Sequence, residues 1–227
     1  MQKIDLSKKA ESFRVSLAKK DILKAPTLRV GAAFDESESM KRNIAEGKLQ
    51  AAFNQTMGIT IEFDDNGELD CLAFNHRCRR IGVATPDNFE RFVDRNLTAG
   101  GSTCYAPIVR ETLSMFFSSQ RAPGIRGLFG KKVSDMTPAL MMVLTDGQND
   151  RDDNHELDMM LGLAQRHPVF FQFVGIGGTK EKFPTIRRLA KTFPNVGEVY
   201  LPRFDMPDAE VYDQIVTDRL VGWLKQF

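Results

Sequence analysis

The chain has 227 residues, 42% hydrophobic and 27% charged, which is the composition of a folded globular protein and excludes a disordered or fibrous one. Its 31 Lys and Arg nearly balance 30 Asp and Glu, so no bulk charge points to nucleic acid as a partner. No stretch resembles a signal peptide or reaches the roughly 20 apolar residues of a membrane span, so we expect a cytoplasmic protein.

The cysteines and histidines exclude two common kinds of site. Three Cys and three His are present, and neither set has the spacing of a disulfide framework or of a zinc site. Any metal chemistry must therefore use oxygen ligands.

The first elements are predicted from apolar runs and their spacing. Residues 28–34 form an apolar run that stops at Asp35, which indicates a strand. Apolar residues at near-helical spacing then predict a helix over 40–57. The order is therefore strand, acidic loop, helix.

Two further runs suggest a hairpin at the edge of the sheet. Residues 59–63 and 69–75 are separated by a polar stretch that contains Asn66-Gly67, a dipeptide that favours tight turns. We therefore expect these two segments to pair as antiparallel strands.

The second half of the chain alternates strands and helices. A buried helix begins near Tyr105, after a Gly-Gly loop. The stretch 121–132 is basic and Gly-rich, which predicts a solvated surface loop, with docking of a partner as the alternative. Beyond it we expect strands at 139–145, 168–174 and 198–201, with helices at 155–166 and 180–192 and a last helix from Tyr212 to the end.

Strands that are apolar throughout and alternate with amphipathic helices are typical of a mostly parallel sheet covered on both faces. The predicted fold class is therefore α/β: a doubly wound, six-stranded sheet with one antiparallel edge strand. In such sheets, ligands bind beyond the carboxyl ends of the strands, where the strand order reverses.

Polar residues follow these carboxyl ends. Asp35, Ser37 and Ser39 come directly after the first strand, Asp146 follows the strand at 139–145, and Thr103 precedes a helix. Alternate side chains of a loop can converge on one point, so these five residues offer a set of oxygen ligands of low charge. That set suits Mg²⁺, with Mn²⁺ fitting as well and Ca²⁺ as a further alternative.

These motifs resemble the metal-ion-dependent adhesion site of von Willebrand factor A (vWA) domains: DxSxS after the first strand, a Gly-Gly loop with a Thr, and Asp-Gly after a later strand. More narrowly, VGAAFDESESM, GGSTCYAPI and VLTDGQND are similar to the A-type domains of bacterial tellurium-resistance proteins. The resemblance implies that the hydroxyls of Ser37, Ser39 and Thr103 ligate the metal while Asp35 and Asp146 act largely through water.

The resemblance also implies a function in binding rather than catalysis. In that family, an open coordination position accepts a carboxylate, so the partner would be a protein that offers an Asp or Glu side chain. A context of tellurium resistance or stress response is implied in the same way. We expect residues 27–227 to form the vWA-like domain and residues 1–26 to be an N-terminal segment that packs on it or precedes it.

Two details of the motif leave alternatives open. Family members commonly have Gly at the position of Glu38, whose side chain either bends into water or occupies the position of the partner. Thr103 is chosen from its spacing to Tyr105-Ala106-Pro107, and Thr98 and Ser102 are weaker choices.

A second hypothesis is a Mg²⁺-dependent phosphoryl-transfer enzyme or phosphoacceptor on a similar fold, with Asp35 as nucleophile. Against this hypothesis, such an enzyme usually has a second acidic residue two positions after the nucleophile, and that position holds Ser37 here. No general base is evident at a strand end either, so the binding module is the preferred hypothesis.

Overall fold

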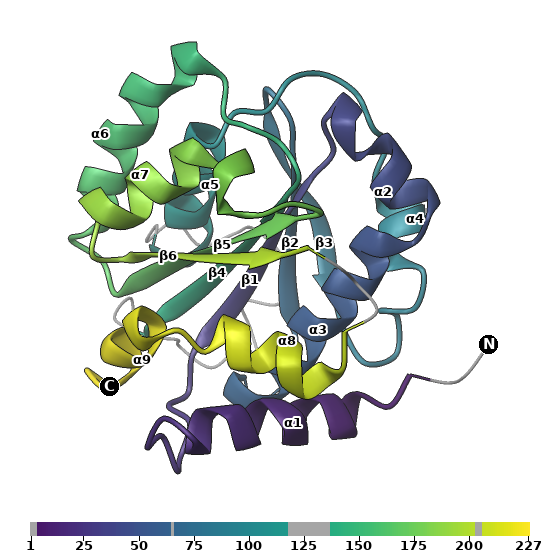
Figure 1. The fold of residues 1–227 in the computed structure, drawn as a ribbon, viewed down its shortest axis with the longest axis vertical. Coiled ribbons are helices and arrows are strands. Elements are labelled where there is room, and N and C mark those ends of the chain that lie inside the picture. The colour runs from purple at the N-terminus through teal and green to yellow at the C-terminus, as the bar shows by residue number, and fades with distance from the viewer. Residues whose placement is uncertain (1–3, 65, 118–136, 203–205) are drawn as a thin grey trace, which may run out of the picture.

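The fold is known from a computed structural model that describes residues 4–64, 66–117, 137–202 and 206–227. Its six-stranded sheet has the order β3-β2-β1-β4-β5-β6 (Figure 1). All neighbouring strands are parallel except β2 and β3, so β3 is the antiparallel edge strand. The strands are β1 (Arg29–Asp35), β2 (Leu69–Phe74), β3 (Cys78–Ala84), β4 (Ala139–Thr145), β5 (Val169–Ile176) and β6 (Val196–Leu201).

Helices cover both faces of the sheet (Figure 1). One face packs against α5 (Ala106–Phe117), α6 (Asn154–Ala164) and α7 (Pro184–Thr192). The other packs against α1 (Leu6–Ala18), α3 (Lys48–Phe63), α4 (Phe92–Asn96), α8 (Asp208–Ile215) and α9 (Asp218–Leu224). The predicted α/β fold class is confirmed, and the central strands are apolar because both of their faces are covered.

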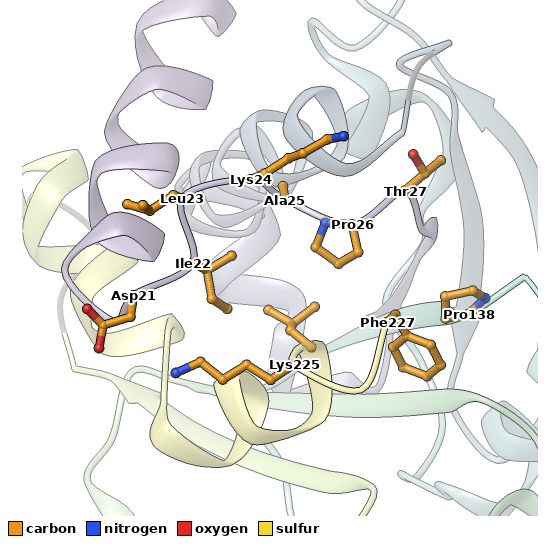
Figure 2. Close-up of a pocket in the computed structure, with 11 residues that line it drawn as sticks. Asp21, Ile22, Leu23, Lys24, Ala25, Pro26, Thr27, Pro138, Lys225 and Phe227 are labelled. Carbon is orange, nitrogen blue, oxygen red and sulfur yellow. The ribbon is translucent and has the colours of Figure 1, made fainter.

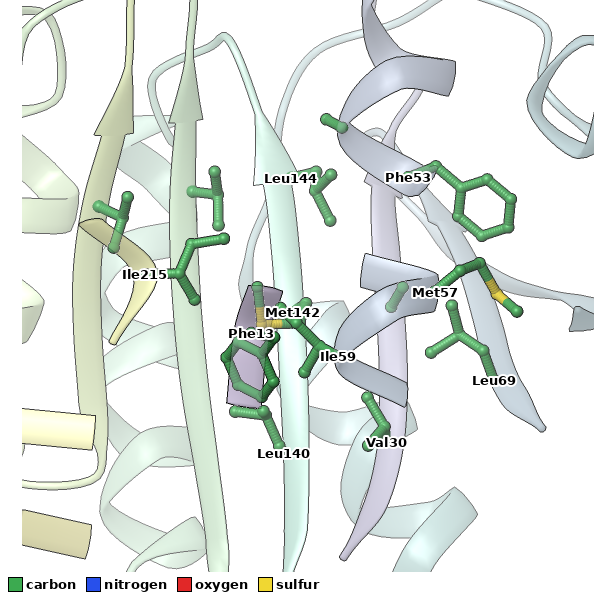
Figure 3. Packing of buried hydrophobic residues seen from close by; sticks show 14 of the residues in the cluster. Phe13, Val30, Phe53, Met57, Ile59, Leu69, Leu140, Met142, Leu144 and Ile215 are labelled. Carbon is green, nitrogen blue, oxygen red and sulfur yellow. The ribbon is translucent and has the colours of Figure 1, made fainter. Parts of the chain in front are cut away.

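Helix α1 is joined to the rest of the domain by apolar packing and by ion pairs. Phe13 is fully buried and belongs to the same core cluster as Leu140 and Met142 of β4 (Figure 3). Arg14 forms an ion pair with Glu62 of α3, and Lys19 forms one with Asp213 of α8. The N-terminal segment therefore packs on the sheet domain through α1.

The predicted hairpin between residues 59–63 and 69–75 is wrong. Residues 59–63 are the last turns of α3, and the strand paired with β2 is β3. The buried side chains of α3 continue at helical spacing through Phe63, so burial of that face outweighs the strand preference of the β-branched residues 59–61. The turn with Asn66-Gly67 joins a helix to a strand.

Two predicted helices are each divided in the structure. The helix expected over 40–57 becomes a 3-10 turn (Glu38–Met40), α2 (Lys41–Ala45) and α3, with Gly47 in the left-handed conformation at φ 71°. The last helix is divided into α8 and α9, with Thr217 capping α9.

Residues 121–132, for which a surface loop was predicted, lie outside the described part of the chain. Among the helices that the structure describes, none has both the length and the apolar character of a membrane span.

Candidate metal centre

The five predicted ligands lie beyond the carboxyl ends of β1 and β4, where the strand order reverses. Asp35 is the last residue of β1, and Asp146 follows Thr145, the last residue of β4. The two strands pair in parallel, so both carboxylates reach the same edge of the sheet. Thr103 lies in the loop before α5, and its backbone carbonyl accepts a hydrogen bond from Asp150 just beyond Asp146.

Hydrogen bonds join four of these residues directly. The Ser37 and Ser39 hydroxyl oxygens are 3.1 Å apart, and the Ser39 hydroxyl donates to Asp146 Oδ1 at 2.6 Å. The backbone N–H of Ser37 donates to Asp35 Oδ1 at 2.8 Å, which fixes the turn after β1. Ser39 does not cap the following helix, because its hydroxyl is engaged with a residue 107 positions later in the chain.

Gly147 shows that oxygen atoms converge on one small space. A Cβ atom placed on this glycine would lie 2.9 Å from Thr103 Oγ1, 3.5 Å from Asp35 Oδ2 and 3.7 Å from Ser39 Oγ. Thr103 is buried, whereas Thr98 and Ser102 are exposed, so Thr103 is the hydroxyl of its loop that faces this space. One carboxylate and two hydroxyls surround this position, and Ser37 and Asp146 are hydrogen-bonded to Ser39 beside it. Such a set of oxygen donors fits a hard divalent cation such as Mg²⁺.

The electrostatics of the cluster also favour a cation. Asp35 is fully buried, and no ion pair between the described residues includes Asp35 or Asp146. Burial raises the pKa of Asp35 to about 6, although hydrogen bonds from Ser37 and Thr145 lower it, and the nearby charge of Asp146 adds to the rise. A bound cation would compensate the charge that burial makes unfavourable.

The other acidic residues of this edge are engaged elsewhere. Glu36 is buried and forms a two-point ion pair with Arg79 of β3. Glu38 is 67% exposed and lies 3.8 Å from Lys41, so its side chain bends into solvent and leaves the oxygen cluster open. Asp153 accepts hydrogen bonds from the backbone N–H groups of Tyr105 and Ala106 at the start of α5.

Three residues at the site were not predicted from the sequence. The Thr145 hydroxyl donates to Asp35 Oδ2, and Asn43 Nδ2 donates to Asp146 Oδ2 at 2.6 Å. The Tyr105 hydroxyl donates to the carbonyl of Gly147 at 2.9 Å and so holds the loop after β4. Thr145 could have been noticed as a polar residue at the end of an apolar strand, but no local pattern marks Asn43.

Thiolate and histidine sites find no support. Within the described residues, no group of three or more His, Cys, Asp or Glu side chains could hold a metal ion. The three cysteines are free, and burial raises the pKa of Cys104 to about 11, so its reactive thiolate form is disfavoured.

Comparisons with known proteins agree with this architecture. The family described as "vWA found in TerF C terminus" matches residues 27–227. "Uncharacterized protein YcbR" of Bacillus subtilis (strain 168) is 26% identical over 234 residues, which cover 100% of this chain and 88% of YcbR.

Two solved structures share the fold. The "von Willebrand factor type A from Catenulispora acidiphila" is 16% identical with a TM-score of 0.59, and the match covers 86% of this chain and 43% of that one. Proximal thread matrix protein 1 from the mussel byssus, with a "zinc occupied MIDAS motif", is 15% identical with a TM-score of 0.57 over 91% of this chain and 51% of that one. The chain thus spans about half or less of the length of these solved structures.

Proposed function

The chain belongs to the family of vWA domains found at the C terminus of TerF, and we propose that it is a metal-dependent protein-binding module. In this proposal, Ser37, Ser39 and Thr103 hold a Mg²⁺-type ion through their hydroxyl oxygens. Asp35 and Asp146 supply negative charge and hydrogen-bond acceptors around it. When bound, the ion supplies an electrophilic position for a carboxylate oxygen of a partner protein.

One observation carries the proposal: three oxygen atoms from two separate loops, the one after β1 and the one before α5, face the space over Gly147 in the loop after β4. Turn formation or helix capping would not require Ser39, Thr103 and Asp35 to face a common point. The position also borders solvent, because Ser39 is exposed and Gly147 is partly exposed, whereas Ser37 and Thr103 are buried. A protein side chain can therefore reach the site from solvent.

The partner in this proposal offers an Asp or Glu side chain, because a hard cation prefers an anionic oxygen for its remaining ligand. Mg²⁺ is the proposed ion, with Mn²⁺ and Ca²⁺ as alternatives. A role in tellurium resistance or a stress response rests only on the family and belongs to the proposal in the same way.

The phosphoacceptor alternative gains no support from the geometry. A nucleophilic Asp must meet its substrate, but Asp35 is fully buried and one of its oxygens accepts the Thr145 hydroxyl. Binding without catalysis is therefore the function that we propose.

Calorimetric titration with Mg²⁺ and Mn²⁺ tests the metal site. We expect the wild type to bind one ion and the Thr103→Ala and Ser39→Ala variants to bind it much more weakly. Ser102→Ala is the matched control, since it removes an exposed hydroxyl from the same loop as Thr103. If titration of the wild type gives no heat of binding, the metal site is contradicted. If Ser102→Ala and Thr103→Ala lose the same metal affinity, the choice of Thr103 as a ligand is contradicted.

A second experiment tests the partner. Proteins retained by the immobilised wild type with Mg²⁺, and released by chelator, are compared with those retained by Ser39→Ala. For a retained protein, replacement of one Asp or Glu by Asn or Gln should abolish binding. Capture that persists in chelator, or that no single acidic substitution affects, would contradict carboxylate recognition.

A further inference from the structure

The two carboxylates of the site are held in the same way, although they come from different strands. Asp35 accepts one hydrogen bond on each oxygen, from the backbone N–H of Ser37 and from the Thr145 hydroxyl. Asp146 also accepts one on each oxygen, from Ser39 and from Asn43, each at 2.6 Å. Each carboxylate is thus restrained in orientation by donors that are neutral.

The donors to the Oδ2 atoms of the two carboxylates, Thr145 and Asn43, differ in their surroundings. Thr145 is fully buried at the end of β4, so its position is fixed by the sheet. Asn43 lies on α2, a helix of five residues that Gly47 separates from α3, and its side chain is only half-buried. The Asn43 amide also lies 3.7 Å from the sulfur of Met40, a buried core residue, so a variant that keeps the amide is needed beside Asn43→Ala.

We propose that Asn43 is a positioning residue that keeps Asp146 out of the inner coordination shell of the ion. This inference rests on the proposed metal site. The Asn43 amide holds Asp146 Oδ2, while Oδ1 accepts the proton of Ser39. The Ser39 oxygen then accepts a hydrogen bond from Ser37 on one lone pair and keeps the other for the ion. The coordination position that Asp146 would otherwise take stays filled by water, which a partner carboxylate can displace.

The physical reason is the competition between oxygen ligands. An anionic carboxylate oxygen is a stronger ligand for a hard divalent cation than water or a hydroxyl. Without the Asn43 amide, Asp146 Oδ2 loses its hydrogen-bond donor and is free to rotate toward the ion. The site would then hold metal more tightly but offer one position fewer to a partner.

Water-proton relaxation with Mn²⁺ measures this difference directly, because it reports the number of waters bound to the ion. We expect Asn43→Ala to bind Mn²⁺ several-fold more tightly than the wild type and to lose inner-shell water. Asn43→Gln keeps an amide donor and should retain more of the wild-type hydration. In an Asp146→Asn background, Asn43→Ala should cause no loss of hydration, which would assign the lost water to Asp146.

Arg42→Ala is the matched control, since it removes the Arg42–Glu46 pair from the same helix without touching Asp146. Its hydration and affinity should equal those of the wild type, and thermal unfolding in chelator verifies that every variant is folded. If Asn43→Ala keeps the wild-type number of bound waters, or if Arg42→Ala loses as many waters, the role of Asn43 is overturned. Binding of Mn²⁺ by the wild type would still support the metal site in that case. A wild type that binds no Mn²⁺ overturns both the site and the inference.

Discussion

The two ends of the sheet differ in what they bury and in how much space they offer. At the amino ends of β1 and β4, a hollow of about 760 Å³ lies between residues 21–27, Pro138 and the end of α9 (Figure 2). Ile22, Leu224 and Phe227 contribute apolar surface to it, and Lys24 and Lys225 are its basic residues. At the carboxyl ends, the candidate metal centre has only the small space over Gly147, but it buries Asp35 and Asp146.

Buried polar groups therefore indicate the chemistry of a site better than the size of a hollow does. In a hollow open to solvent, charged side chains such as those of Lys24 and Lys225 stay hydrated, so nothing in it requires a ligand. A buried carboxylate without an ion-pair partner is costly and needs a physical explanation. At the carboxyl ends of the strands, the cation that we propose would provide one.

The largest expected difference between the two ends of the sheet comes from Asp35 at the carboxyl end. In chelator, this residue should make the free energy of unfolding depend on pH. The pKa of Asp35 is about 6 in the folded chain against 3.8 for an unperturbed Asp side chain, so folding favours its protonated form. Asp35 therefore destabilises the metal-free protein above about pH 6, by about 3 kcal/mol, and this penalty disappears as the pH falls toward 4.

Denaturant unfolding between pH 4 and 8 checks this prediction. The difference between the wild type and Asp35→Asn isolates Asp35 from the other acids, among which pairing with Lys19 lowers the pKa of Asp213. Glu38→Gln, which alters an exposed acid of the same loop, should leave the wild-type curve unchanged. Parallel curves for the wild type and Asp35→Asn would mean that Asp35 carries no penalty.

The second effect is stabilisation by metal. At a Mg²⁺ concentration of 100 times Kd, we expect a gain of about 2.7 kcal/mol in the free energy of unfolding. Thermal unfolding should show a rise in Tm for the wild type and none for Ser37→Ala combined with Thr103→Ala. An equal rise in that double variant would place the bound ion elsewhere on the chain.

A smaller effect distinguishes a residue that stabilises α5 from a residue that binds the ion at the carboxyl end of the sheet. Asp153→Ala removes the acceptor for two backbone N–H groups at the start of α5, which should cost about 1 kcal/mol. The rise in Tm with Mg²⁺ should persist, because Asp153 holds the helix rather than the ion. Complete loss of the metal response in a folded Asp153→Ala variant would make Asp153 part of the site.

The smallest effect is expected at the amino end. Leu23 is 84% exposed beside the hollow, so Leu23→Ser should change the free energy of unfolding by less than about 0.5 kcal/mol. Mg²⁺ affinity measured by calorimetry should equal that of the wild type. A large change in affinity would show that the two ends of the sheet are coupled.

Local patterns in the sequence were sufficient for much of the fold. The runs at 28–34, 139–145 and 168–174 are strands because their apolar residues are buried on both faces of the sheet. The same reasoning failed at 59–63, where β-branched residues are typical of strands but the buried face of α3 continues at helical spacing. Periodicity over a few residues cannot show which partner a segment will bury itself against.

For the candidate site, the five polar residues could be identified from the sequence alone, and four of them could be placed at one edge of the sheet, because parallel strands end at a common edge. How these residues are held depends on the folded chain, because Asn43 lies 103 residues from Asp146 and Thr145 lies 110 residues from Asp35. The fold also pairs Glu36 with Arg79, whereas Glu38 points into solvent. These contacts depend on the crossing of distant segments, which no local spacing in the chain records.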